Sequence, residues 1–222
     1  MARKSTGYFY TPREIVDYMV GEALARSLAT LLAEGAAGDA TVLDGLRRLV
    51  DDRLEGNPFD AAGTARLVAA IGKLRILDPA CGSGAFPMGI LHRLVAMLRK
   101  LDPGNRQWKD EKLASLPAEM RDRAAETFRE ESFDYTRKLE LIKDCIYGVD
   151  IQPAAIQIAK LRFFLSLVIE QQATARLRPL PNLDIKFVCA NSLLGLPRPD
   201  GWELFQHQIE PRERALLDTR AR

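Results

Sequence analysis

The chain contains few cysteines, and they form no metal-binding pattern. Cys81, Cys145 and Cys189 are the three cysteines among 222 residues, and no two of them have Cys-x-x-Cys spacing. A zinc site is therefore not expected, and we predict no metal ligands. An odd number of cysteines without a secretory signal is typical of the reducing cytoplasm. We accordingly predict a cytoplasmic protein in which all three are buried free thiols.

The sequence also lacks a long apolar run and a strong net charge. The longest apolar stretch, around residues 163–169, is far too short to cross a bilayer, so we predict no membrane partner. The net charge is +2, which neither requires nor excludes a nucleic-acid partner. A hydrophobic content of 47% and a charged content of 28% are typical of a folded domain with a substantial core.

Short apolar segments alternate with helical patterns in the middle of the chain. Three such segments are predicted as strands: residues 74–77, 145–149 and 185–190. A polar residue follows each of them: Asp78, Asp150 and Asn191. Helices are expected at residues 85–101 and from Pro153 onward, the latter apolar on nearly all sides and therefore buried against a sheet. This alternation predicts an α/β fold with a doubly wound parallel sheet, incomplete at three strands, whose ligands bind beyond the carboxyl ends of the strands.

The residues before the first strand have helical patterns. Helices are predicted at residues 12–34, 41–54 and 62–72. Thr11 is expected to cap the first of them, with Pro12 at the first helical position and Glu14 completing a capping box. We therefore divide the chain into three parts: an N-terminal helical segment (1–73), an α/β half-domain (74–196, with a charged helical insertion at 106–143) and a polar tail (197–222).

A glycine loop connects the first strand to its helix. Residues 78–86 read Asp-Pro-Ala-Cys-Gly-Ser-Gly-Ala-Phe. Loop amides and a helix N-terminus attract an anion, while the Asp78 carboxylate attracts a cation. The zwitterionic amino-acid group of S-adenosylmethionine (SAM) fits both. A nucleotide site and a structural turn are the alternatives, but Pro87 replaces the third glycine of a dinucleotide fingerprint and no P-loop lysine motif is present.

The next two strand ends suggest contacts for the rest of that cofactor. Asp150 can accept hydrogen bonds from both ribose hydroxyls, unless it only caps the following helix. It lies 66 residues after Gly84, whereas Asp102, only 18 residues after Gly84, follows a helix instead of a strand. Ile151 could pack on the adenine ring. Asn191 could bond the adenine edge, unless it only forms a turn.

Four segments in this order resemble the adenine-specific DNA methyltransferases of restriction–modification and phage-defence systems. The segments are residues 7–12, 78–86, 147–155 and 191–194. Within that family the resemblance is to type I modification subunits, fused type II restriction-methylases and phage-exclusion methylases, with Asn191 where many members carry aspartate. The resemblance implies a SAM-dependent, Rossmann-like methyltransferase fold and a set of cofactor-binding residues: Tyr10, Thr11, Asp78, Pro79, Ala80, Cys81, Gly82, Gly84, Phe86, Asp150, Ile151, Asn191 and Ser192.

The family's catalytic loop is absent from the sequence. That loop reads Asn, Asp or Ser followed by Pro-Pro and an aromatic residue, and it binds the amine of a flipped-out base. Asn57-Pro58-Phe59 is one proline short, and we predict a turn there. The resemblance therefore implies a cofactor-binding fragment that is inactive alone, from an enzyme that methylates the exocyclic amine of adenine in DNA.

The same interpretation predicts partners and leaves two alternatives. The full-length enzyme would bind DNA and a restriction or specificity subunit. The first strand would lack a neighbour on one side, so the fragment is expected to self-associate through this uncovered edge. The alternatives are a methyltransferase acting on RNA or on a protein amide, and a non-catalytic module that binds SAM.

Overall fold

The computed structural model describes residues 11–33, 40–121, 125, 132–170 and 182–194. Residues up to Ser192 form one compact unit and the remainder of the chain a second. Among the predicted site residues, Tyr10 lies outside the described ranges. The predicted boundaries at residues 74 and 197 stay predictions, and helices from both sides of residue 74 share one hydrophobic core.

The centre of the fold is a parallel sheet of three strands in the order β1-β2-β3. The strands are β1 (Ile76–Asp78), β2 (Ile146–Asp150) and β3 (Phe187–Cys189). Gly148 of β2 lies level with Asp78 on one side and Phe187 on the other. The predicted parallel α/β order is confirmed. Asp78 and Asp150 are the last residues of their strands instead of the first residues after them, because their backbones still pair with the neighbouring strand.

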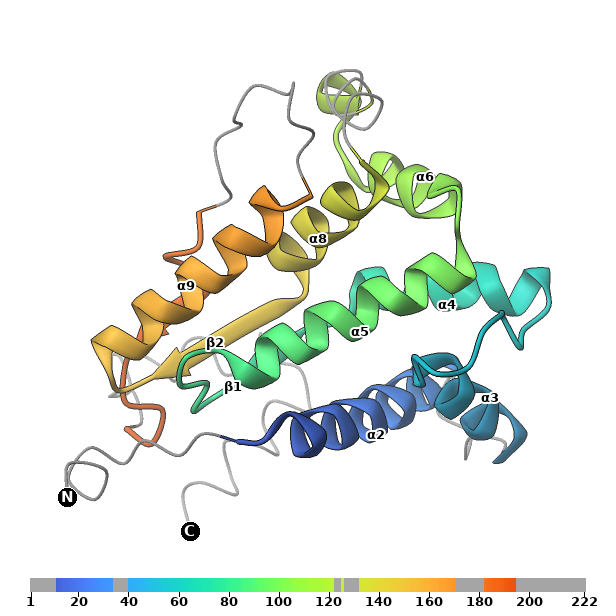
Figure 1. Ribbon diagram of the computed structural model, residues 1–222. Coiled ribbons are helices and arrows are strands. Elements are labelled where there is room, and N and C mark those ends of the chain that lie inside the picture. Colours follow the sequence, from blue (N-terminus) through green and yellow to red (C-terminus); the bar gives the residue numbers. More distant parts are fainter. Residues whose placement is uncertain (1–10, 34–39, 122–124, 126–131, 171–181, 195–222) are drawn as a thin grey trace, which may run out of the picture. The chain divides into compact units, whose positions relative to one another are not determined.

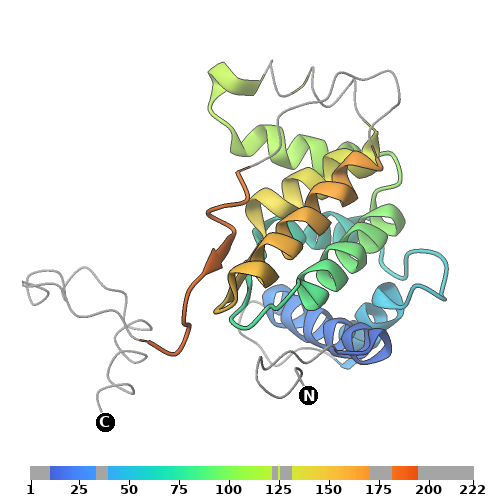
Figure 2. The same cartoon turned by 60° about the vertical axis from the view of Figure 1, so that its left-hand side comes forward.

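Three helices cover one face of this sheet. They are α5 (Ala85–Leu101), α8 (Phe133–Asp144) and α9 (Pro153–Val168), and α5 has the predicted bounds. The order β1-β2-β3 advances in one direction, so right-handed crossovers place these helices on the same side (Figures 1 and 2). On the opposite face Leu77 is 60% exposed and Val188 41% exposed. Helices on both faces, as in a doubly wound sheet, stay a prediction.

The N-terminal segment adds further helices to the core. They are α2 (Arg13–Leu32), α3 (Ala40–Val50) and α4 (Ala61–Lys73), and α6 (Arg106–Ser115) follows α5. Helix α2 packs closely on α5, because a Cβ atom at Gly89 would lie only 2.7 Å from Cγ1 of Val16. The two helices run side by side in the same direction (Figure 1), so both N-termini lie near the glycine loop.

The predicted capping box at the start of α2 is wrong. Pro12, with ψ of 148°, is the N-cap and has no side chain to bond the helix amides. Its carbonyl accepts hydrogen bonds from the amides of Ile15 and Val16, both at 3.1 Å. Thr11 therefore lies one residue outside the cap. Helix α4 does have a side-chain cap, since Asp60 accepts from the Gly63 amide at 2.7 Å.

Two predictions of burial are also corrected. Helix α9 is not buried on all sides: an apolar stripe is exposed to between 46% and 78%, formed by Ile158, Leu161 and Leu165 of the helix and by Ile169, its C-cap residue. These residues face away from the sheet, whereas Phe163 and Leu167 pack into the core. Cys81 and Cys145 are buried as expected, but Cys189 is exposed because β3 is an edge strand. Within the described ranges, every helix is too short or too polar to cross a membrane.

Candidate functional site

The glycine loop is a tight turn between β1 and α5. Gly82 and Gly84 have positive φ angles of 54° and 84°, which residues with a Cβ atom rarely adopt. The Cys81 amide donates to the Val149 carbonyl at 2.9 Å, and the Gly84 amide donates to the Cys81 carbonyl at 2.8 Å. A Cβ atom at Gly82 would meet nothing within 4 Å. The outer side of the loop is therefore open to a ligand.

Asp150 joins this loop to the end of β2. Its Oδ2 atom accepts from the Gly82 amide and its Oδ1 atom from the Gln152 amide, both at 2.8 Å. Each carboxylate oxygen has a further lone pair, so the group can also accept from a pair of hydroxyls. The structure thus places Asp150 beside a loop that lies 68 residues earlier in the sequence, as the sequence pattern predicts.

Asp78 has one oxygen that is buried and unpaired. Its Oδ1 atom accepts from the Ala80 amide at 3.1 Å, whereas Oδ2 is buried without a hydrogen-bond partner in the described structure. Burial raises the pKa of Asp78; the Ala80 hydrogen bond opposes this increase, and the nearby charge of Asp150 adds to it. An unpaired buried carboxylate oxygen is costly, and a cationic group placed beside it would satisfy it.

The loop amides divide into those already bonded and those still free. Bonded amides belong to Ala80, Cys81, Gly82 and Gly84. Pro79 has no N–H group, and the Ser83 amide has no acceptor among the described residues. Ala85 and Phe86 begin α5, so their amides have no acceptor within the helix, and none is provided by the described residues. The two amides at the start of the helix are the natural anion donors, because the helix dipole also favours an anion there. Ala85 is not among the residues predicted from the sequence to bind the cofactor, although its place directly after the last loop glycine is a usable signal.

Cys81 has a structural position beneath the loop. A Cβ atom at Gly148 would lie 2.9 Å from the Cys81 sulfur and 2.8 Å from the Phe187 ring, so only glycine fits there. Burial raises the pKa of the Cys81 thiol to about 12, and the negative charges of Asp78 and Asp150 add to this effect. The thiol therefore stays protonated at neutral pH and packs as a small apolar group.

The end of β3 lies beside Asp150. The Ala190 amide donates to the Asp150 carbonyl at 3.0 Å, which brings Asn191 and Ser192 to the same edge of the sheet. Both are exposed, and Ile151 is 61% exposed. The structure therefore gathers Asp78, Asp150 and the predicted adenine-binding segment around one open edge.

Phe86 and Thr11 lie near the same end of α5 but have different surroundings. The Phe86 ring packs against the core and lines an apolar groove of about 680 Å³ between α2, β1 and α5, together with Met19 and Leu77. The group of Phe86 that could bind an anion is therefore its backbone amide and not its ring. Thr11 is partly buried just before α2, whose N-terminus lies near the loop end of α5 (Figure 1).

Two sequence alternatives have local structural roles. The Asn57 amide group donates to Thr64 Oγ1 at 2.7 Å, and its Oδ1 atom accepts from the Phe59 amide at 3.0 Å, so Asn57-Pro58-Phe59 is a turn before α4. Asp102 accepts from the amides of Arg106 and Trp108 at 3.0 and 2.8 Å. Asp102 therefore holds the start of α6, and each of its carboxylate oxygens already accepts a backbone amide.

Comparison with known proteins gives one informative match. No family model matches the sequence. A protein of Methanocaldococcus jannaschii, named "Putative type II restriction enzyme and methyltransferase RM.MjaORFECS2P", is 28% identical over 200 residues. The match covers 87% of this chain and 15% of that protein. The chain is thus similar to a small part of a much longer relative.

Proposed function

We propose that this chain binds SAM and is the cofactor-binding part of a restriction–modification methyltransferase that methylates the exocyclic amine of adenine in DNA. The single observation that carries the proposal is that one loop has, among the described residues, an unpaired and buried Asp78 Oδ2 atom at its strand end and free amides of Ala85 and Phe86 at its helix end. One end of the loop needs a cation and the other end needs an anion. The amino-acid part of SAM carries both charges.

The other contacts follow from the same edge of the sheet. Asp150 would accept from the ribose hydroxyls, Ile151 would pack on the adenine ring, and Asn191 and Ser192 would bond the adenine edge. When bound, SAM supplies an electrophilic methyl group. This chain's own residues hold and orient the cofactor; the sequence has no Asn/Asp/Ser-Pro-Pro-aromatic loop to bind the acceptor amine, and we expect no methyl transfer by the chain alone.

The relative's name supports the enzyme class. That protein is named as a restriction enzyme and methyltransferase, and the matched region is 15% of its length. DNA, and a restriction or specificity subunit, are then partners of the complete enzyme. The preference for adenine in DNA over RNA or a protein amide depends on the resemblance of the four sequence segments.

The proposal is tested by calorimetric titration with three ligands. SAM, 5′-methylthioadenosine (which lacks the amino-acid group) and adenosine are titrated into the wild-type chain, Asp78→Asn and Asp150→Asn. We expect Asp78→Asn to weaken SAM binding by about 10- to 100-fold, the loss of a charged hydrogen bond, with little change for the other two ligands. Asp150→Asn should weaken all three.

The control is an acidic residue outside the site. Asp184 pairs with Lys160 at 2.6 Å and its side chain is 81% exposed, so Asp184→Asn should bind all three ligands like the wild type. Absence of SAM binding by a wild-type chain that is folded by circular dichroism would refute the proposal. SAM binding without transfer of labelled methyl to DNA, RNA or protein would support a cofactor-binding part.

A further inference from the structure

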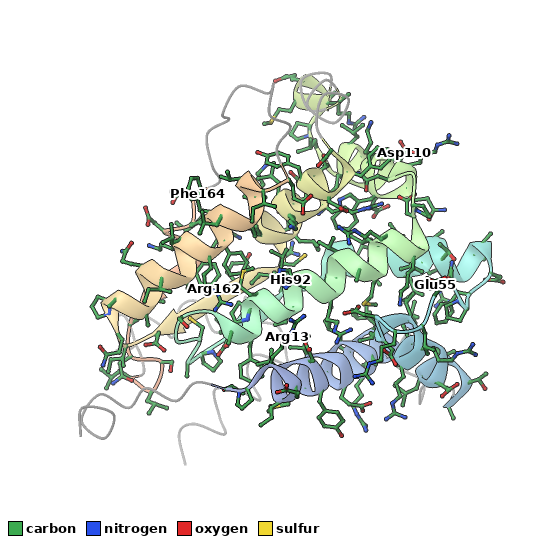
Figure 3. The ribbon with its side chains drawn as sticks, in the orientation of Figure 1. Arg13, Glu55, His92, Asp110, Arg162 and Phe164 are labelled. Atoms are coloured by element: carbon green, nitrogen blue, oxygen red, sulfur yellow. The ribbon has the colours of Figure 1, made fainter. Side chains whose placement is uncertain are left out.

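Helix α9 supports the glycine loop from the side of the helices. A Cβ atom at Gly84 would lie 3.2 Å from the Ala159 Cβ atom and 3.9 Å from the Phe163 ring, so the loop backbone lies close against α9. One turn along the same helix surface, Arg162 Nη1 donates to the Ser83 carbonyl at 3.0 Å. Figure 3 shows Arg162 on the side of α9 that faces α5.

The Arg162 bond fixes one peptide group of the loop from both ends. The Ser83 carbonyl and the Gly84 amide belong to the same planar peptide. Arg162 holds its oxygen, and the Cys81 carbonyl holds its N–H group at 2.8 Å. This peptide directly precedes α5 and sets its starting direction. It therefore determines where the free amides of Ala85 and Phe86 point.

We propose that Arg162 is a positioning residue that aims these two amides at the carboxylate of the cofactor's amino-acid group. The inference rests on the proposed function. Arg162 also brings a fixed positive charge to the end of α5 where the helix dipole already favours an anion. Arg162 is outside the four segments that resemble the methyltransferase family, so neither its position nor its residue type marks it in the sequence.

The decisive test compares SAM with a ligand that lacks its whole amino-acid chain and, with that chain, the positive charge on sulfur. SAM and 5′-methylthioadenosine are titrated into the wild-type chain, Arg162→Met and Arg162→Lys. Because only SAM has a carboxylate, Arg162→Met should weaken SAM binding roughly tenfold and leave 5′-methylthioadenosine binding within about twofold, as expected for loss of one hydrogen-bond-sized contribution. Arg162→Lys keeps the charge and should recover part of the difference.

A matched control has the same chemistry away from the site. Arg66 Nη2 donates to the Leu32 carbonyl at 2.6 Å, so Arg66→Met also removes an arginine–carbonyl bond and should leave both affinities unchanged. Equal weakening of both ligands by Arg162→Met would indicate general damage to the fold and overturn the inference, as would unchanged SAM binding. If the wild type binds 5′-methylthioadenosine but not SAM, or binds neither, the proposed function fails first and the inference with it.

Discussion

The two ends of helix α5 contain similar residues but differ in how completely their polar groups are hydrogen-bonded. Each end has an aspartate and a residue with positive φ: Asp78 with Gly84 at the start, Asp102 with Asn105 at the finish. At the finish, both Asp102 oxygens accept backbone amides. At the start, one Asp78 oxygen is buried and has no partner among the residues that the structure describes. A saturated network stabilises the fold, whereas an unsatisfied charged group at an open edge is chemically suited to bind a ligand.

Arg137 completes the saturated end. Its Nε atom donates to Asn105 Oδ1 at 3.2 Å, Nη1 donates to Asp134 Oδ1 at 3.0 Å, and Nη2 donates to the Asp102 carbonyl. The guanidinium thus places a positive charge at the C-terminus of α5, where the helix dipole favours it. The buried Trp108 Nε1 atom has no partner within the described part of the chain, but a neutral N–H group costs much less to leave unpaired than a carboxylate oxygen.

The largest effect should come from breaking the saturated end. Arg137 is 2% exposed, so Arg137→Met leaves the buried Asn105 Oδ1 atom and the Asp102 carbonyl without this donor, while Asp134 keeps its ion pair with Arg99. We expect a loss of about 2–5 kcal/mol in the free energy of unfolding, since each buried acceptor left unpaired costs roughly 1–3 kcal/mol. Urea denaturation checks this, with Arg26→Met as control: Arg26 pairs with Glu22 at an exposed position and should contribute less than about 1 kcal/mol. A loss of that small size in Arg137→Met would contradict the assignment of this end to stability.

The next largest effect is an increase in the free energy of unfolding, and it comes from a substitution of Asp78 at the start of α5. The folded-state pKa of Asp78 is raised, so its favourable contribution is present below the unfolded value of 3.8 and is lost as pH rises through the folded value. Asp78→Asn removes the charge and should raise the free energy of unfolding at pH 7 by roughly 1 kcal/mol, while it weakens SAM binding.

The pH dependence separates this effect from a simple packing change. The stability gain of Asp78→Asn should shrink as pH falls toward 3.8, where the wild-type carboxyl is protonated too. Asp134 behaves in the opposite way: burial would raise its pKa, but hydrogen bonds from Arg99 and Arg137 outweigh burial and lower it, so its contribution is lost at low pH. Urea denaturation at pH 7 and pH 4 measures both. A destabilised Asp78→Asn at pH 7 would show that Asp78 supports the fold and is not poised for a ligand.

The glycine loop end of the site was predictable because its chemistry is local. An acid after an apolar strand, two glycines and a helix start specify a turn with positive φ angles, and α5 begins at Ala85 as expected. Asp150 was also predictable, because parallel strands bring their carboxyl ends to one edge. The sequence could not show which oxygen of Asp78 lacks a partner, since that depends on contacts between segments far apart in the chain.

Most of the wrong predictions about the fold also arose because they depend on contacts between distant segments. Cys189 and the outer stripe of α9 have apolar sequence patterns, but exposure depends on how many layers surround them. The predicted start of α2 was wrong for a local reason. Pro12 has an extended backbone and is itself the N-cap, so the helix begins at Arg13 and Thr11 is too far away to cap it. The Arg162–Ser83 contact links residues 79 positions apart and has no sequence signal.

The variant with the smallest expected change in stability is a substitution at the uncovered edge of β1. It tests whether the Asp78 end of α5 needs a second protein surface against that edge as well as a ligand. The Ile76 amide donates to the Cys145 carbonyl, directly before β2, at 2.7 Å. The backbone groups of Leu77 therefore point to the other edge of β1, where the described residues provide no strand. The apolar groove lies beside this edge.

We expect the wild-type chain to self-associate with rising concentration in light scattering, and Leu77→Lys to remain monomeric because a charged edge strand resists pairing. The exposed Leu77→Lys change should alter the free energy of unfolding by less than about 0.5 kcal/mol. A wild-type monomer at all concentrations would refute self-association. If SAM affinity is the same in both proteins, the site needs only its ligand; if it rises with self-association, the open edge and the unpaired Asp78 oxygen are two parts of one incomplete site.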